Sequence, residues 1–432
     1  MPKHEDVSPQ LLDRLYAVVT ILAAAVYYFS NPKPQGYYDY TFRVAANILG
    51  GNIAFTEKQP SWLNEFVPFE GFYYSVFPFG SVLTMIPFAL LKVAGLISDM
   101  PAAWIASGLA GVICLFLFLI GRAYDIDPTR LVVMALGVLF GTWMWTNLTM
   151  AGAWQLALGF AMVGELGAIY FTVYDRRPLI AGLFFALAFG NRTENLLTAP
   201  IFFWLLYRSV GFRSLGGTAP KEKSPRVDDH AQPPAEAGGT ELSLIPRLRP
   251  IAFFCAAPFV LGTLTLVYNY VRFHSFTDFG YARIPGVLNE PWYNHGIFSY
   301  HYIPRQMWEM MWKPWETRAA FPYLLPDRFS SSIFWSSPFI LFAFRFGSRD
   351  QALKYAAWIA VLVLCILLWI HGNSGGWQFG YRYAMVCLPW LFVIMLESAP
   401  KKITPLEWAA YGFSFAANAY ATWLFHWTEY MK

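Results

Sequence analysis

The sequence predicts an all-α protein that crosses a membrane many times. Of its 432 residues, 56% are hydrophobic and 13% are charged, and this charged fraction is roughly half that of an ordinary soluble domain. Aromatic residues make up 19% of the chain, more than lipid-facing helices require, so many of them are expected to line an interface or a ligand groove. The net charge of +4 is too small to indicate a nucleic-acid-binding protein.

Apolar segments that are long enough, or nearly long enough, to cross about 30 Å of hydrocarbon recur along the chain. They are residues 15–30, 78–97, 102–121, 131–148, 153–174, 179–191, 194–208, 251–271, 331–346, 355–370, 384–397 and 405–425. The first has no small-residue cleavage site after it and is expected to stay attached as a helix. All the cysteines lie in apolar runs and are expected to be buried as small hydrophobic side chains.

The basic residues between these segments predict the orientation of the chain. They are Arg122 with Arg130, Arg176 with Arg177, Arg208 with Arg213, Arg345 with Arg349 and Lys354, and Lys401 with Lys402. All five clusters face the cytoplasm, with the N-terminus inside, if one segment before residue 121 does not span. We assign this role to residues 78–97, which contain Pro87 and Lys92 and suit a juxtamembrane or re-entrant helix. The prediction is about 11 spans plus this helix.

Composition divides the chain into three parts. Residues 1–210 form an N-terminal transmembrane module, residues 211–249 a disordered cytoplasmic linker rich in Pro, Gly and charge, and residues 250–432 a C-terminal transmembrane module. The C-terminal module contains a large external loop over residues 272–330. The segments on either side of residues 191–195 are short for spans, so this polar tip is expected to lie below the membrane surface and to line a cavity.

Asp39 stands just after the first apolar segment and directly before a helical pattern that ends at Gly50-Gly51. Asp is a favoured N-cap residue, and capping is one interpretation. The other is a general base at the membrane surface. The two roles are compatible, and both stay open.

Four short motifs in this order resemble those of the GT-C superfamily. They are the acidic motif at Asp39, the stretch from Gly71 to Gly80, the sequence Asn-Arg-Thr-Glu-Asn-Leu-Leu over residues 191–197, and Gly-Gly-Trp-Gln-Phe-Gly-Tyr-Arg-Tyr over residues 375–383. The superfamily includes protein O-mannosyltransferases and the aminoarabinose transferase of lipid A. Its members are integral membrane glycosyltransferases that use polyprenyl-phosphate sugars.

The resemblance implies roles for individual residues. Asp39 matches the catalytic acid of the first external loop, but Tyr40 follows it where the family commonly has a second acid. That second carboxylate is expected at Glu65 or Glu70. The expected substrate-groove residues are Tyr38, Tyr73, Tyr74, Glu194 and His295.

The chemistry of a phosphate leaving group calls for cations, and Arg192 and Arg382 are the candidates because a guanidinium holds phosphate by paired hydrogen bonds. The alternative is that both are interfacial side chains that snorkel to the membrane surface. If neither binds phosphate, the phosphate site is to be sought among Arg272, Arg283, Arg305 and Lys313.

The other polar residues do not point to a specific catalytic or binding role. No metal is assigned, because the histidines near Glu290 lack a recognised ligand spacing. The pair Asp125 and Asp127 is interpreted as a turn and a helix cap before Pro128. Glu165 lies within an apolar segment and is expected either to pair inside the bundle or to act as a proton site.

Together these features predict a glycosyltransferase in the plasma (inner) membrane. It would move a sugar from a polyprenyl-phosphate donor to a lipid-linked or polymeric acceptor on the extracytoplasmic face, by a single inverting displacement. Its expected partners are this donor, this acceptor and the membrane. The alternatives are a transporter or flippase of a lipid-linked sugar, and a protein that only binds a polyprenyl lipid.

Overall fold

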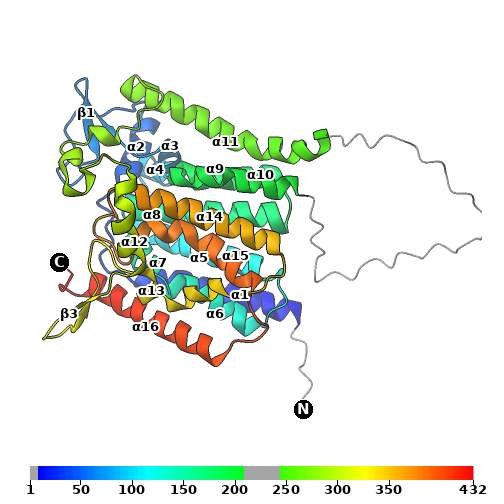
Figure 1. Cartoon of the computed structure of the whole chain (residues 1–432). Coiled ribbons are helices and arrows are strands. Elements are labelled where there is room, and N and C mark those ends of the chain that lie inside the picture. The colour runs from blue at the N-terminus through cyan, green and yellow to red at the C-terminus, as the bar shows by residue number, and fades with distance from the viewer. Residues whose placement is uncertain (1–7, 209–243, 432) are drawn as a thin grey trace, which may run out of the picture.

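The chain is mostly helical, as a computed structural model shows for residues 8–208 and 244–431. Long helices lie side by side in a bundle, and most of the short helices and the strands gather at one end of it (Figure 1). The two sheets in these residues are both antiparallel pairs of short strands. The predicted linker, residues 211–249, falls mainly outside the described residues, and its last part belongs to helix α11, which begins at Leu244.

The helices differ widely in length. The α-helices are α1 (Pro9–Phe29), α2 (Tyr40–Leu49), α3 (Phe79–Leu83), α4 (Ile86–Val93), α5 (Ala102–Gly121), α6 (Pro128–Phe140), α7 (Met144–Met150), α8 (Ala153–Ile169), α9 (Pro178–Asn191), α10 (Ala199–Tyr207), α11 (Leu244–Phe273), α12 (Ile303–Met311), α13 (Ile333–Ser336), α14 (Gln351–Ile370), α15 (Leu388–Glu397) and α16 (Pro405–Trp427). The 3₁₀ and π turns are η1 (Tyr170–Tyr174), η2 (Thr193–Thr198), η3 (Tyr281–Arg283), η4 (Val287–Asn289), η5 (Pro291–Tyr293), η6 (Tyr300–Tyr302), η7 (Pro338–Phe344) and η8 (Arg382–Cys387). The strands are β1 (Phe66–Phe69), β2 (Phe72–Ser75), β3 (Glu316–Thr317) and β4 (Leu324–Leu325).

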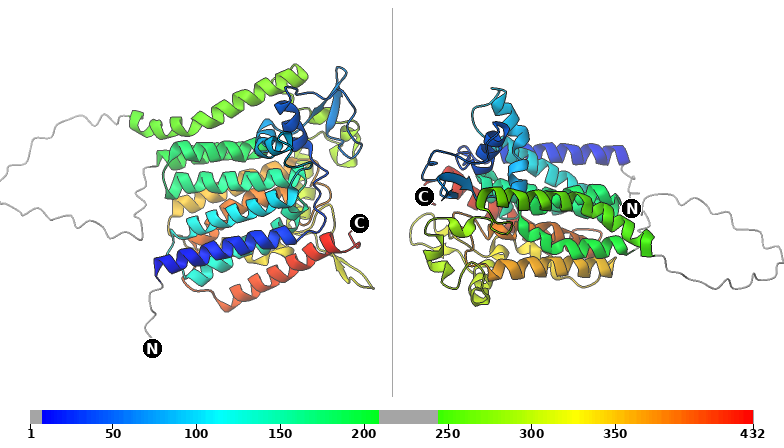
Figure 2. Two further views of the ribbon diagram at one scale, coloured as in Figure 1. Left: turned by 180° about the vertical axis from the view of Figure 1, so that it is seen from behind. Right: turned by 90° about the horizontal axis from the view of Figure 1, so that it is seen from above.

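Five helices in the described residues are long and apolar enough to cross a membrane. They are α1, α5, α8 with η1, the part Leu248–Phe273 of α11, and α14. The pair α6 and α7, bent by 51°, counts as a sixth if it forms one broken span. Two of the long helices, α1 and α11, bury few of their residues, 17% and 11% of the tested windows, and α11 runs along the outside of the bundle (Figure 2). Large exposed apolar faces of this kind suit contact with lipid.

The segment over residues 331–346, which was expected to span, does not form one continuous helix. This segment is divided between α13 and η7, and the helical path breaks at Ser337, directly before Pro338. Proline lacks the N–H that would continue the hydrogen-bond ladder, so the preceding residue is a natural end for a helix. The amide of Asn418 compensates for the break by donating to the Ser336 carbonyl oxygen at 2.8 Å.

The segment over residues 78–97 forms two short helices, α3 and α4, and not one long helix. The longer, α4, has 8 residues and a length of about 12 Å, too short to cross a bilayer, in agreement with the juxtamembrane or re-entrant interpretation. A Cβ atom at Gly80 would lie 2.4 Å from the Cα atom of Gly190. This close approach holds α3 against the end of α9, where the polar tip begins.

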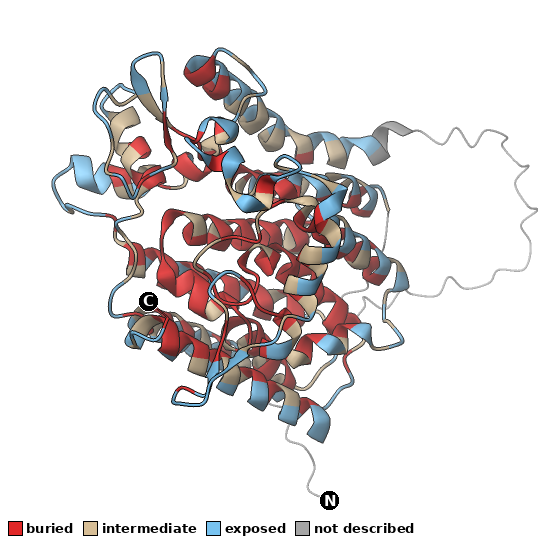
Figure 3. Cartoon of the chain, turned by 60° about the vertical axis from the view of Figure 1, so that its left-hand side comes forward, coloured by how far each residue is buried: buried red, intermediate tan, exposed pale blue. Residues whose placement is uncertain are grey.

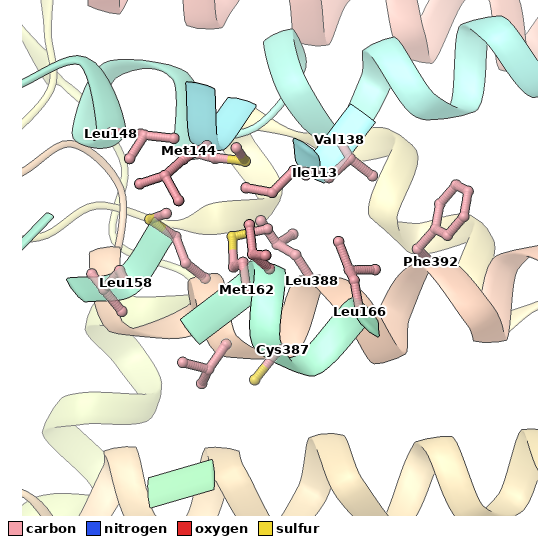
Figure 4. Packing of buried hydrophobic residues seen from close by; sticks show 14 of the residues in the cluster. Ile113, Val138, Met144, Leu148, Leu158, Met162, Leu166, Cys387, Leu388 and Phe392 are labelled. Carbon is pink, nitrogen blue, oxygen red and sulfur yellow. The ribbon is translucent and has the colours of Figure 1, made fainter. Parts of the chain in front are cut away.

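The interior of the bundle is filled by apolar side chains from helices that are far apart in the sequence. Figure 4 shows Ile113 of α5, Met144 of α7, Met162 of α8 and Leu388 of α15 in one cluster, and all four are almost fully buried. Buried residues are concentrated along the bundle axis, whereas exposed residues lie on the outer helices and the loops (Figure 3). This packing holds the ends of the central helices in fixed positions.

The described members of the five predicted basic clusters lie at the same end of the bundle, as the contacts between their surroundings show, whereas Arg213 lies outside the described residues. These contacts are Arg176 to the Leu206 carbonyl at 2.9 Å, Arg208 to Asp350 at 3.0 Å, Arg349 to the Ala399 carbonyl at 3.0 Å, Lys401 to Asp125 at 3.0 Å and Arg130 to the Lys402 carbonyl at 2.8 Å. Asp127 also caps α6 as expected, since its side chain accepts from the Thr129 amide.

The gathering of the clusters predicts which end of the bundle faces the cytoplasm. In a cysteine-free background, cysteines introduced at position 39 and at positions 289–300 are expected to react with a membrane-impermeant maleimide from outside intact cells. Cysteines at positions 122 and 401 are expected to react only after the cells are permeabilised. Labelling of position 401 in intact cells would show that the chain has the opposite orientation to the one predicted.

Candidate functional site

Two arginines begin the 3₁₀ turns of two broken helical segments. Arg192 directly precedes η2, which leads into α10, and Arg382 is the first residue of η8, which leads into α15. A glycine lies two positions before each arginine. One of them, Gly380, has a φ of +67°, and a Cβ atom there would lie 2.7 Å from Cβ of Trp143. Only glycine suits this tight turn, which fixes the direction in which Arg382 leaves the backbone.

The two guanidinium groups meet at one aromatic ring. The Arg192 guanidinium lies 4.8 Å from the centre of the Tyr383 ring, and that of Arg382 lies 5.1 Å from it. Arg192 comes from the N-terminal half of the chain and Arg382 from the C-terminal half. Both are largely shielded from solvent, and Arg382 is 6% exposed. Two shielded cations beside one another favour an anion between them or next to them.

A carboxylate belongs to the same cluster. Glu65, the residue before β1, accepts hydrogen bonds from the indole N–H of Trp154 at 2.9 Å to each carboxylate oxygen. The Arg382 guanidinium lies 6.0 Å from the Trp154 ring. Burial raises the pKa of Glu65 to about 7, although the Trp154 hydrogen bond and the charges of Arg382 and Arg192 act to lower it. A carboxyl group with a pKa near 7 exchanges protons readily at neutral pH.

The cluster has more positive than negative charge to share with a ligand. Glu194 neutralises Arg192 through an ion pair of 2.7 Å. Among the described residues, the hydrogen-bond partners of the Arg382 guanidinium are neutral, namely the Gly376 carbonyl at 3.1 Å and the Tyr383 hydroxyl at 3.4 Å. Its Nε atom is buried and has no hydrogen-bond partner among the described residues. An unused buried donor on an unpaired guanidinium suits an anionic group such as phosphate.

Aromatic side chains from the large loop stand next to this cluster. The hydroxyl groups of Tyr281 and Tyr293 lie 2.8 Å apart. The Tyr293 ring is 5.9 Å from the His371 ring, which in turn is 6.1 Å from the ring of Tyr383. Aromatic rings of the loop therefore line one side of the site. Sequence reasoning missed Trp154, Tyr281 and Tyr293, because nothing distinguishes them from the many other aromatic residues of the chain, and it assigned no role to Tyr383 although this residue ends the motif over residues 375–383.

Asp39 lies beside the arginine cluster but outside it. It occupies the N-cap position of α2, yet its side chain makes no capping hydrogen bond and forms an ion pair with Arg43 at 3.1 Å. Burial raises the pKa of Asp39, and the positive charges of Arg43 and Lys92 partly offset this effect. The neighbouring Tyr38 contacts the cluster, because its ring lies 4.9 Å from that of Trp154.

Comparison with known proteins gives no family: no protein-family model, no curated protein and no solved structure matches this chain. The GT-C resemblance therefore stays a prediction from the short motifs. The function of the chain has to be inferred from the geometry of the site.

Four of the expected site residues lie away from the arginines. Glu70 is at the turn between β1 and β2 and contacts His274 at 3.0 Å in an exposed position. Tyr73 belongs to β2 and pairs with Phe55 through the backbone, and Tyr74 packs on Phe273. His295 is stacked on another loop histidine with ring centres 4.3 Å apart. No described contact connects these four residues to Arg192 or Arg382, whereas Glu65, Glu194 and Tyr38 do join the cluster.

The remaining external cations already have protein partners. Arg272 donates to the Ser75 carbonyl and to the Asn269 side chain, Arg283 pairs with Asp278, Arg305 donates to the Gly372 carbonyl, and Lys313 pairs with Asp327. Arg283 and Lys313 are neutralised by carboxylates and are therefore less suitable for a phosphate than Arg382, whereas Arg272 and Arg305 donate to neutral oxygens, as Arg382 does.

Glu165 pairs inside the bundle, where the indole N–H of Trp390 donates to one of its oxygens. The four cysteines are free, as expected. Within residues 8–208 and 244–431, no group of three or more His, Cys, Asp or Glu side chains is placed to hold a metal ion. The functional groups at the site are therefore the guanidinium groups of Arg192 and Arg382 and the titrating carboxyl group of Glu65.

Proposed function

We propose that this chain is an integral membrane glycosyltransferase. It takes a sugar from a polyprenyl-phosphate donor and transfers it to a lipid-linked or polymeric acceptor on the extracytoplasmic face, with inversion at the anomeric carbon. The observation that carries the proposal is the meeting of Arg192 and Arg382 at the ring of Tyr383, beside the titrating carboxyl group of Glu65.

The arginines bind the phosphate of the donor in this proposal. When the bond between the anomeric carbon and the phosphate oxygen breaks, its electron pair stays on the phosphate, whose negative charge increases. A fixed guanidinium stabilises that charge more in the transition state than in the bound donor. Arg382 is better placed for this than Arg192, because it has no anionic partner among the described residues.

Glu65 accepts the proton in this proposal. The hydroxyl oxygen of the acceptor attacks the anomeric carbon, a new C–O bond forms, and the hydroxyl proton passes to the Glu65 carboxylate. Trp154 holds that carboxylate by both oxygens. Glu65 suits this role better than Asp39, because the Asp39 carboxylate is ion-paired with Arg43 and no described contact connects Asp39 with Arg192 or Arg382.

The depth of the site supports a lipid-linked donor. Helix α9 has 14 residues, which gives about 21 Å at 1.5 Å per residue. A helix of this length that begins at one face of a hydrocarbon core of ~30 Å ends inside the membrane. Arg192 follows its last residue, so a phosphate carried on a polyprenyl chain would reach this residue without leaving the bilayer.

A transporter or flippase of a lipid-linked sugar is the second candidate function. The observation in its favour is that η2 with α10 and η8 with α15 are similar broken segments, one in each half of the chain, and each begins at an arginine. Interrupted segments at matching positions of two halves are typical of transporter binding sites. In the enzyme, the adjacent Glu65 carboxyl group would serve as the acceptor for the proton of the attacking hydroxyl.

Mass spectrometry of lipid and glycan extracts from cells with and without the gene tests the proposal. If the chain is a transferase, deletion is expected to remove one sugar from an acceptor and to leave its polyprenyl-phosphate donor accumulated or unchanged. The purified protein in liposomes should then release free polyprenyl phosphate only when donor and acceptor are both present. Movement of the donor between leaflets with no release of polyprenyl phosphate would favour the flippase.

A further inference from the structure

A concave site lies at the end of the bundle where α1 ends and α5 begins. We call it the Asp99 groove. Its volume is ≈ 440 Å³, and its lining includes Tyr37, Asp39, Arg43, Trp62, Asp99 and Trp104. This volume is within the range of about 300–1,000 Å³ that is usual for sites of small ligands.

The charges in the Asp99 groove are of both signs. Asp39 and Arg43 neutralise one another, and the hydrogen bonds between them use the Nε and Nη2 atoms of Arg43. No hydrogen bond from Nη1 to another described residue is present, so this part of the guanidinium is available. Asp99 is exposed, and its described hydrogen bond comes from the hydroxyl of the adjacent Ser98 at 2.8 Å. Among the described residues, the groove therefore offers one carboxylate without a cationic partner and one guanidinium edge.

Three aromatic side chains of the groove are exposed. Tyr37 is 53%, Trp62 52% and Trp104 65% exposed. An ammonium group is attracted to the face of such rings, and the attraction is strongest for tryptophan. Exposed rings next to an unpaired carboxylate therefore select for a cationic group.

The groove is placed where the headgroups of a membrane would lie. Trp104 is the third residue of α5, an apolar helix of 20 residues that is long enough to span. The first turn of a spanning helix lies at the interface between hydrocarbon and water, where tryptophan is enriched. A ligand in the Asp99 groove is thus at the level of phospholipid headgroups.

We propose that the Asp99 groove binds the headgroup of a phospholipid that carries both an ammonium and a phosphate group, of the phosphatidylethanolamine type. The ammonium lies between Asp99 and the rings of Trp62 and Trp104, and the phosphate accepts hydrogen bonds from Nη1 of Arg43. The acyl chains extend along the apolar surface beside α5. The ligand proposed here is a bilayer lipid and not the sugar donor, and its binding does not depend on which carboxylate is the base of the proposed glycosyl transfer.

Lipid retention tests the proposal directly. The full-length protein is placed in nanodiscs of equal parts phosphatidylethanolamine and phosphatidylglycerol, extracted into mild detergent, and the lipids that stay bound are counted by native mass spectrometry. The wild type is expected to retain phosphatidylethanolamine in preference. Asp99→Asn and Trp62→Ala are each expected to reduce this preference about three- to tenfold, the effect expected for loss of one charged or cation–π contact.

The control is Trp312→Ala, which removes a tryptophan that is 59% exposed and does not line the groove. It is expected to leave the lipid preference unchanged, and the thermal stability of all three variants should match that of the wild type because the side chains are exposed. Equal retention of both lipids by the wild type, or an unchanged preference in Asp99→Asn, would overturn the proposal. The assay contains no sugar donor, so its result is separate from that of the transferase test.

Discussion

Replacing Glu65 by Gln is expected to reduce turnover by about 10²- to 10⁴-fold, the usual contribution of a positioned general base. The amide keeps the shape of the side chain but cannot accept the proton of the acceptor hydroxyl. The measurement is the rate at which the purified protein releases polyprenyl phosphate at saturating donor and acceptor. An unchanged rate would exclude Glu65 as the proton acceptor.

The pKa of Glu65 gives this prediction a pH dependence. Only the ionised carboxyl group accepts a proton, so turnover of the wild type is expected to rise with pH and to level off above about 7. The raised pKa also implies that ionisation of Glu65, between its ordinary value of 4.5 and about 7, reduces the stability of the folded protein. Glu65→Gln avoids this cost and is expected to be at least as stable as the wild type at pH 8.

Asp39→Asn is the matched comparison. It removes a carboxylate of the same external region that pairs with Arg43 but does not contact the arginine cluster, and a smaller loss of turnover is expected. The opposite result, a large loss in Asp39→Asn with little loss in Glu65→Gln, would assign the base to Asp39, as the GT-C resemblance implies.

Replacing Arg382 or Arg192 by Gln is expected to reduce turnover by about 10²-fold or more, because one fixed donor to the developing charge is lost. The effect should be larger for Arg382, since Arg192 shares its charge with Glu194. Lysine is expected to restore part of the activity, because it returns the charge but not the paired hydrogen-bond geometry. The measurements are turnover and donor affinity, and affinity should fall less than turnover.

Arg283→Gln is the control for these arginine variants. It removes an external cation that pairs with Asp278 at 2.7 Å and has no described contact with the cluster, so turnover should stay near that of the wild type. If Arg192→Gln and Arg382→Gln fold normally and keep full turnover, both are interfacial anchors and the phosphate site lies elsewhere.

The sequence predicted which charged residues belong to the cluster, but it did not predict how they contact one another. Arg192 and Arg382 stood out because each is a charge in a short polar stretch between apolar segments. Glu65 was proposed only because it belongs to the first external loop, and nothing local indicated that Trp154 would hold it. The same loop also suggested Glu70, which lies at an exposed turn. Contacts between residues far apart in the chain depend on packing, which the spacing of residue types does not encode.

The accuracy of the prediction also differed from one helix to another. The long apolar helices α5 and α14 were found within a few residues of their ends, because their hydropathy is uniform. The segment over residues 331–346 was also predicted as a span from its apolar residues, yet Pro338 and the neighbouring serines break it. A hydropathy average detects the apolar residues of such a segment but not the local backbone geometry. The described residues contain five or six helices that are long and apolar enough to span, so the predicted total of 11 spans is not confirmed.

The sharing of Tyr383 between two arginines has a consequence for biosynthesis. The residue that brings Arg192 and Arg382 together is made almost two hundred residues after Arg192, so the anion site does not exist while the first half of the chain is already in the bilayer. During this interval the ion pair with Glu194, only two residues away, supplies a local countercharge for Arg192 and lowers the cost of holding it at membrane depth. A partly synthesised chain would therefore tolerate Arg192 in the membrane, and the proposed phosphate site would form only after Tyr383 has been added.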